Sequence, residues 1–291
     1  MATPREIRRR IRSVRNTSQI TRAMEMVSAA KMRRAQERVR AARPYAERIR
    51  LMIAGLSALG ASVDQSAFPL LQQRPVNRVG VVLVTADRGL AGAFNTNVIR
   101  RAVRFIREEA GHPAELITVG RKGRDFFART TQEIEAEFTA LGDAPSMDTL
   151  RPIIDISIQD FIDGKVDAVY LIYTKFVNTL TQQPEVLQIL PITAPEDASA
   201  EEQVQDFIFE PDPVTVLQAL LPRYIETQVY QALLESVASE HSARMVAMRA
   251  ASDNANEFIN ELTLTLNKAR QAQITREVSE IAAGAAALGG R

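Results

Sequence analysis

Residues 18–36 read SQITRAMEMVSAAKMRRAQ, a stretch without glycine or proline in which nearly every residue tolerates a helix. It lies within a longer segment, from about Pro4 to Leu59, whose first glycine is Gly55. Pro4 suits the first turn of a helix. The segment therefore predicts one helix of roughly 55 residues, about 80 Å long at 1.5 Å per residue. Such a helix is too long for the core of an ordinary domain of this size.

Small and apolar residues recur along this helix at alternating spacings of three and four, the pattern of a heptad seam that needs a partner helix. The C-terminal part of the seam consists of Met32, Ala35, Val39, Ala42, Ala46, Ile49, Ile53 and Leu56. In the same register the seam continues backwards through polar residues, Ser28, Glu25, Thr21 and Ser18, to Val14, Ile11 and Ile7. Pro44 is expected to kink the helix.

Between about Arg78 and Ile192 the pattern changes to apolar runs that are followed by short turns and helices. RVGVVLVTADRGLAGAFN (residues 78–95) and ELITVGRKGRDFF (115–127) both read as strand, glycine-containing turn and helix. A helix is expected at 147–162, further strands at 167–174 and 186–192, and a polar loop at 195–202. Strands that alternate with helices predict an α/β layer with a largely parallel sheet.

After Pro222 the chain contains no proline, and no glycine before Gly284, so that some 60 residues form one predicted helix. Its apolar stripe comprises Ile259, Leu262, Leu266 and Ala269, then changes register through Ile274, Val278, Ile281, Ala285 and Leu288. The predicted fold class is therefore α/β. A long antiparallel coiled coil of the N- and C-terminal helices (residues 1–59 and 212–288) carries an inserted Rossmann-like α/β domain (residues 76–194).

Composition excludes several classes of protein. The chain has no cysteine and only two histidines, which excludes disulfides and thiolate sites and argues against a histidine-based metal site. No run of about 18 apolar residues is present, and no apolar signal-peptide core follows the basic start, so a bacterial cytoplasmic compartment is expected. Residues 1–50 nevertheless hold 15 Lys/Arg and 4 Asp/Glu, a net charge of +11, against −10 for the remainder. This asymmetry suits either an anionic partner, including nucleic acid, or a solvated helix.

The stretch DRGLAGAF (residues 87–94) could hold phosphate on backbone N–H groups at a strand-to-helix turn. Its G-x-x-G spacing differs from both nucleotide-binding fingerprints, however, and Gly120 and Gly123 repeat that spacing after the next strand. Asp87, Arg88, Gly89 and Gly92 are therefore interpreted as a structural turn, in which Asp87 forms an internal ion pair or cap. Adjacent residues of a helix point about 100° apart, so His241 and Ser242 do not form a nucleophile–base pair. The residues predict no catalytic site, metal site or cofactor.

Several stretches together resemble the gamma subunit of F-type ATP synthases. They are MEMVSAAKMRRAQ and RPYAE near the start, TADRGLAGAFN in the middle, residues 210–254, and ITREVSEIAAGAAAL near the end. The resemblance covers nearly the whole chain, and its terminal signature comprises Ile274, Thr275, Glu277, Glu280, Gly284 and Ala285. It implies a non-catalytic rotor shaft that turns inside the ring of alpha and beta subunits, with the α/β domain touching the epsilon subunit and the membrane ring of c subunits. The shaft would couple ion flow to ATP synthesis or hydrolysis and reach the membrane, on its cytoplasmic face, only through its partners.

The resemblance also implies which residues contact the stator. They are Met24 at the shaft–beta contact, and Arg244, Arg270, Gln271, Thr275, Glu277 and Glu280 in the region that engages the beta loops. The two glutamates are expected to polarise Thr275 or to pair with cations of the first helix. Small or flexible side chains such as Met24, Ala29, Ala30 and Met32 are expected to form a bearing surface, because a large apolar stripe would favour one rotational angle.

Some positions depart from the family's pattern. Ala91 stands where a cysteine is common and Ala93 where glycine is frequent, and the cysteine-bearing insertion of the chloroplast branch is missing. No transit segment precedes the matching region, which favours a bacterial protein. The main alternative from the residues is a basic coiled-coil protein that binds nucleic acid. Tyr45 is the only aromatic residue among the first 50, which argues against base stacking on this segment. A small α/β enzyme that binds phosphate at residues 87–94 is the third hypothesis.

Overall fold

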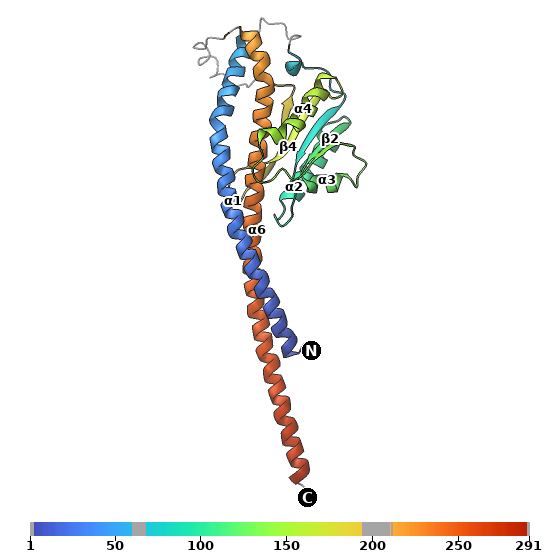
Figure 1. Ribbon diagram of the computed structural model, residues 1–291. Coiled ribbons are helices and arrows are strands. Elements are labelled where there is room, and N and C mark those ends of the chain that lie inside the picture. Colours follow the sequence, from blue (N-terminus) through green and yellow to red (C-terminus); the bar gives the residue numbers. More distant parts are fainter. Residues whose placement is uncertain (1–2, 60–67, 194–209, 211, 290–291) are drawn as a thin grey trace. The chain divides into compact units, whose positions relative to one another are not determined.

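The computed structural model describes residues 3–59, 68–193, 210 and 212–289 (Figure 1). The chain divides into two compact units: the first combines residues 1–27 with 245–291, and the second comprises residues 28–244. Two long helices contribute to both units, α1 (Pro4–Leu59, 56 residues) and α6 (Pro213–Gly289, 77 residues). The predicted helices are therefore both present, and α6 begins nine residues before Pro222. The loop expected at 195–202 lies outside the described residues.

The second unit contains a five-stranded sheet with the order β3-β2-β1-β4-β5. The first four strands are parallel and β5 is antiparallel to β4. The strands are β1 (Val79–Val84), β2 (Ala114–Val119), β3 (Ile134–Phe138), β4 (Ala168–Phe176) and β5 (Gln182–Leu190). The helices between them are α2 (Phe94–Arg104), α3 (Arg121–Phe127) and α4 (Met147–Ile162), with a π-helical turn at Phe105–Glu109 and a 3-10 turn at Pro69–Leu71. The predicted α/β layer is confirmed, although β3 was not predicted and the last strand begins earlier than residue 186.

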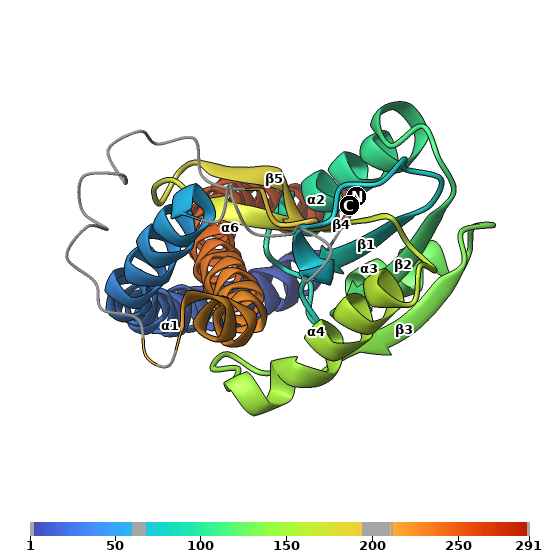
Figure 2. The ribbon, with the colours of Figure 1, turned by 90° about the horizontal axis from the view of Figure 1, so that it is seen from above.

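Both faces of the sheet are covered, so all six residues of β1 are buried. On one face α2, α3 and the π-helical turn pack against the strands. On the other face α4 and residues 217–233 of α6 pack together with Ile49 of α1 (Figure 2). Continuous burial on two faces is typical of a central parallel strand and explains the unbroken apolar run VGVVLV.

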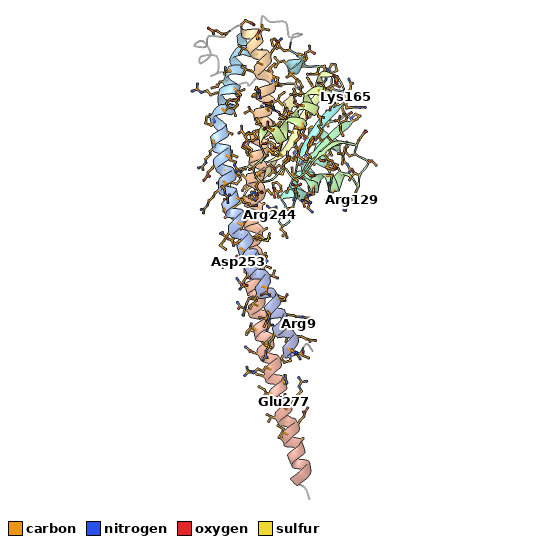
Figure 3. The ribbon with its side chains drawn as sticks, viewed as in Figure 1. Arg9, Arg129, Lys165, Arg244, Asp253 and Glu277 are labelled. Atoms are coloured by element: carbon orange, nitrogen blue, oxygen red, sulfur yellow. The ribbon has the colours of Figure 1, made fainter. Side chains whose placement is uncertain are left out.

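The heptad seam of α1 has the predicted register. Each seam position whose side chain is described is buried or half-buried, from Ile7 to Ile49. On α6 the first part of the predicted stripe, Ile259, Leu262, Leu266 and Ala269, is also buried or half-buried. Its continuation through Ile274, Val278 and Ile281 is exposed in this chain, because α1 ends before these residues (Figure 3). The side chains of Ile53, Leu56, Ala285 and Leu288 lie outside the described set. Over the described ranges, neither the long nor the short helices combine the length and mean hydropathy that crossing a bilayer requires.

Candidate functional site

The turn that follows β1 is held to α3 and to the loop after β3 by Asp87. The Asp87 Oδ1 atom accepts a hydrogen bond from the backbone N–H of Arg121 (3.1 Å), and Oδ2 accepts one from Ala140 (2.9 Å). The Arg121 Nε atom lies 3.7 Å from Oδ1. Asp87 therefore caps α3, and its ion-pair partner is Arg121 rather than the adjacent Arg88.

Four of the backbone donors that could bind phosphate at this edge of the sheet already have partners within the fold. At the start of α3 the N–H groups of Arg121, Lys122 and Gly123 donate to Asp87 Oδ1, Ala86 O and Thr85 Oγ1. The first N–H of α2 donates to a carbonyl of the preceding turn. An anion at either helix start would have to displace these bonds.

The space beside these donors is also small. A cavity of about 40 Å³ remains at the carboxyl ends of β1 and β2, covered by residues 141–142 and by Leu233, Ser236, Val237 and Glu240 of α6. A water molecule has a share of about 30 Å³ in the liquid, whereas pockets for small-molecule ligands measure about 300 Å³ or more. The fold thus fills the place where many α/β domains bind a nucleotide, which argues against the phosphate-binding enzyme.

The two G-x-x-G turns contain glycine for different reasons. Gly120 has φ +95°, and a Cβ atom there would lie 2.1 Å from the carbonyl oxygen of Thr85, so the backbone approach excludes a side chain. Gly92 has φ +54°, a left-handed conformation that glycine adopts without strain. Leu90 adopts the same region (φ +63°) and is 63% exposed. The turn after β1 therefore presents an apolar side chain on a strained backbone.

Arg244 of α6 is buried and contacts this turn (Figure 3). Its Nη2 atom donates to Glu240 Oε1 (2.5 Å) and to the carbonyl oxygen of Gly89 (3.3 Å), and Nη1 donates to His241 Nδ1 (3.3 Å). Burial raises the pKa of Glu240, although the neighbouring guanidinium opposes that shift. Arg244 is 8% exposed, so in the chain alone it positions the turn instead of presenting its charge to solvent.

The polar part of the α1 seam is an interface between helices. In the first unit Ser18 Oγ donates to Asn256 Oδ1 (3.1 Å), Thr21 Oγ1 lies 2.7 Å from Ser252 Oγ, and Arg249 Nε donates to Glu25 Oε1 (2.8 Å). As the residue numbers rise along α1 they fall along α6, so this part of α1 runs antiparallel to α6. Large apolar residues are absent from the seam between Ser18 and Glu25 because its inner face forms hydrogen bonds.

The bearing surface is only partly where it was expected. Met32 is 7% exposed, so its assignment to that surface was wrong: it occupies a seam position and packs inside the second unit. Met24 is half-buried. The strongly exposed apolar side chains of this region are instead Ile20 (60%), Met26 (63%) and Val27 (55%).

The C-terminal candidate residues share one environment. Residues 270–283 of α6 are all exposed, and in Figure 3 Glu277 lies where α6 extends beyond the N-terminal end of α1. The Thr275 hydroxyl donates to the carbonyl oxygen of Gln271 (3.0 Å), and Glu277 accepts from Gln273 (2.9 Å). In the chain alone the Thr275 hydroxyl is thus bonded to its own helix backbone, and its polarisation by Glu277 or Glu280 stays a prediction. Arg270, Gln271 and Glu280 are likewise exposed helix positions.

A carboxylate cluster was not foreseen. Glu115, Glu135 and Asp160 come from β2, β3 and α4, and their oxygens lie within 4.8 Å of one another. Lys165 Nζ lies 2.6 Å from Asp160 and 3.9 Å from Glu135, so an ammonium group already pairs with two of the three carboxylates. Burial, followed by repulsion from Asp160, raises the pKa of Glu135 to about 7. The three carboxylates are far apart in the sequence, so no local sequence pattern indicated that they form a cluster.

Comparison with known sequences identifies relatives over the full length. A family model described as "ATP synthase" matches residues 3–288. A protein of Roseiflexus castenholzii named ATP synthase gamma chain is 53% identical over 291 residues, covering 99% of both chains. The protein of the same name from Chloroflexus aurantiacus is 53% identical over 290 residues, again covering 99% of both chains.

Comparison with solved structures finds the same architecture at low sequence identity. A chain of the Euglena gracilis mitochondrial ATP synthase, in a structure of OSCP, F1 and the c-ring, aligns with a TM-score of 0.68 and 19% identity. The alignment covers 98% of this chain and 94% of that one. A chain from the central stalk and c-ring of the Tetrahymena thermophila mitochondrial enzyme aligns with a TM-score of 0.61 and 24% identity, covering 80% and 99% of the two chains. At these identities the likeness concerns the fold.

Proposed function

This chain belongs to the family of ATP synthase gamma chains, and we propose that it is the central rotor shaft of an F-type ATP synthase. In that role it transmits torque between the ion-driven c ring and the nucleotide sites of the alpha/beta hexamer. The observation that carries the proposal is the full-length match to gamma chains at about half identity. The long helices α1 and α6 suit the same role, because a rotor shaft needs a stiff element that is longer than the α/β domain it carries. No comparison favours the nucleic-acid alternative.

We propose that α1 and α6 form an antiparallel coiled coil over their shared length. The heptad register of α1 and the ordered contacts of residues 18–25 with 249–256 support this arrangement. The proposed functional parts are the helix of residues 1–59, a Rossmann-like α/β domain of residues 76–194, and the helix of residues 212–288. The coiled coil would be the shaft and the α/β domain the part that receives torque.

The proposed partners are the alpha and beta subunits around the helices, and the epsilon subunit and c ring at the α/β domain. The exposed residues of α6 between Arg270 and Glu280 have the solvent-facing positions that contact with a housing needs. Met24, half-buried on α1, would contribute through its exposed part. We assign Arg244 an indirect role, through the turn at Gly89. The chain would lie at the cytoplasmic face of the membrane and be held there by its partners.

We propose that the subunit itself is non-catalytic. The occupied backbone donors and the 40 Å³ cavity at the carboxyl edge of the sheet support this proposal. The nucleotide chemistry of the complex would then belong to the alpha and beta subunits.

Co-expression of this chain with alpha and beta subunits of the same source tests the proposal. The complex, isolated through a tag on this chain, is expected to contain three alpha, three beta and one copy of this chain, and to hydrolyse ATP when the chain alone does not. Correctly folded alpha and beta subunits that never associate with this chain would refute the rotor function.

A further inference from the structure

Asp143 lies where the loop between β3 and α4 meets both long helices. Lys31 Nζ lies 2.6 Å from Asp143 Oδ2, and Arg38 Nη1 donates to the Asp143 carbonyl oxygen (3.0 Å). Lys31 and Arg38 are seven residues apart, two turns of α1, and therefore lie on the same face of that helix. Two cationic side chains of α1 therefore contact Asp143.

From the other side, α6 contacts the same carboxylate through a buried imidazole. His241 is 3% exposed, and its Nε2 atom lies 3.0 Å from Asp143 Oδ1. Arg244 donates to His241 Nδ1, so that nitrogen is the acceptor and the proton of the neutral ring is on Nε2, the atom that lies nearest to Asp143 Oδ1. Burial lowers the pKa of His241 to about 4, and the ring is neutral at physiological pH. Each oxygen of the carboxylate therefore contacts a different helix.

The loop that carries Asp143 is itself tied to the sheet. The Ala140 N–H donates to Asp87 Oδ2 (2.9 Å), and Ser146 caps α4 through a capping box with Thr149. Ala140 and Gly142 both have positive φ, of +61° and +77°, so the loop follows a tightly specified path. A force on Asp143 is therefore passed to β1, through Asp87, and to α4.

The contacts of Asp143 are directional, whereas the apolar packing around them is not. Apolar packing between α6 and the sheet is non-directional, so it resists separation better than it resists sliding. Charge-assisted hydrogen bonds have defined lengths and angles, and a tangential displacement of a helix stretches them at once. Burial opposes the ionisation of Asp143, but Lys31 and His241 outweigh it and lower the Asp143 pKa, so the contacts persist at neutral pH.

We propose that Asp143 is a torque clasp, a point at which the α/β domain is fixed against rotation relative to α1 and α6 together, beside the α6 hydrogen bonds of Ser239, Ser242 and Arg244 to the domain. This inference rests on the proposed function as a rotor shaft. Asp143 is a positioning residue on this view: it contacts no substrate and acts by preventing rotation of the α/β domain relative to the helices. Loss of the clasp would let the domain turn further for the same torque.

The experiment uses the assembled complex, immobilised through its hexamer and paused in one nucleotide state. Because the chain has no cysteine, an Arg129→Cys substitution on an exposed position attaches a bead specifically to the α/β domain. A second variant carries the bead on the exposed Gln218→Cys position of α6. The measured quantity is the width of the angular distribution of the bead, which grows as torsional stiffness falls.

Asp143→Ala is expected to widen the distribution for the bead on the domain and to leave it unchanged for the bead on α6. Asp148→Asn, a nearby carboxylate that is 86% exposed, is the matched control and is expected to change neither. Asp143→Glu, which keeps a carboxylate at this position, is expected to keep a narrower distribution than Asp143→Ala. Unchanged widths for Asp143→Ala, even with a lower melting temperature, would overturn the clasp and make the residue merely stabilising. Failure of the unmodified chain to assemble or rotate would instead refute the proposed function.

Discussion

The hydrogen bond between Thr21 and Ser252 allows a quantitative test of the polar seam. Thr21→Val keeps the shape of the side chain but removes the hydroxyl that lies 2.7 Å from Ser252 Oγ and also donates to the Ser18 carbonyl oxygen (3.0 Å). A net intramolecular hydrogen bond contributes about 1 kcal/mol, and a buried hydroxyl left without a partner costs about 1–3 kcal/mol. Ser252 is 4% exposed, but its hydroxyl can turn to a carbonyl of its own helix, which limits the loss. We therefore expect Thr21→Val to destabilise this helix pair by about 1–2 kcal/mol.

The double variant Thr21→Val with Ser252→Ala should be destabilised less than Thr21→Val alone. Replacing both hydroxyl groups removes the unsatisfied partner, so adding Ser252→Ala to Thr21→Val should recover most of the loss. The coupling between the two sites, measured as a double-mutant cycle, is expected to be about 1 kcal/mol. Amide hydrogen exchange reports this locally, because about 1–2 kcal/mol changes the population of open helix by a factor of about 5–30. The readout is the exchange rate of peptides from residues 246–260.

A matched control is available on the same helix. Thr263 is exposed, and its hydroxyl donates to the Ile259 carbonyl oxygen (2.7 Å) within α6, so Thr263→Val removes a hydroxyl without touching α1. It should leave the exchange of these peptides nearly unchanged. Purely additive effects of Thr21→Val and Ser252→Ala, or no effect of either, would show that the seam is not held by this bond.

Three further changes test other parts of the structure. Gly120→Ala should prevent stable folding of the α/β domain, seen as loss of the cooperative melting transition, because its Cβ atom would lie 2.1 Å from a carbonyl oxygen; Gly89→Ala, with open space around it, should melt like the unmodified chain. The folded-state pKa of Glu135, about 7, exceeds its ordinary value, so its protonation stabilises the fold at low pH and this contribution is lost as pH rises from about 4.5 to 7. Glu135→Gln should remove that slope from melting temperatures measured across this range. Arg244→Ala should destabilise the chain by about 1.5–3 kcal/mol in denaturant unfolding, because it leaves the half-buried carboxylate of Glu240 without its charged hydrogen-bond partner.

The sequence alone predicts the parts of this fold that depend on local periodicity. The spacing of small residues in α1 determined which face is buried, because heptad spacing and helix geometry leave one solution. Apolar runs next to glycine turns located β1 and β2 for a similar reason. In β3 (IEAEF), glutamates alternate with half-buried residues at the edge of the sheet, and so short an edge strand gives a weak pattern.

Contacts between distant residues could not be predicted from one sequence. Arg244 was assigned to an external contact, but it bonds Gly89, which is 155 residues away. Met32 was placed on the bearing surface because its side chain is flexible, although its seam position already implied burial. The family resemblance suggested the role of Arg244 and the residue type that of Met32, whereas the tertiary environment determined what each side chain contacts.

The polar seam also explains how the helices avoid a wrong register. An apolar seam alone discriminates poorly between registers of the two helices, because a slip of one heptad still sets apolar residues against apolar residues. Thr21 faces Ser252 in the structure, and a slip of one heptad would set it against Ile259 or Met245 instead. Its hydroxyl would then lose its partner across the interface, at a cost of about 1–3 kcal/mol that the correct register avoids. The short polar residues of this seam thus contribute less to stability than leucine would, and more to the choice of a single alignment.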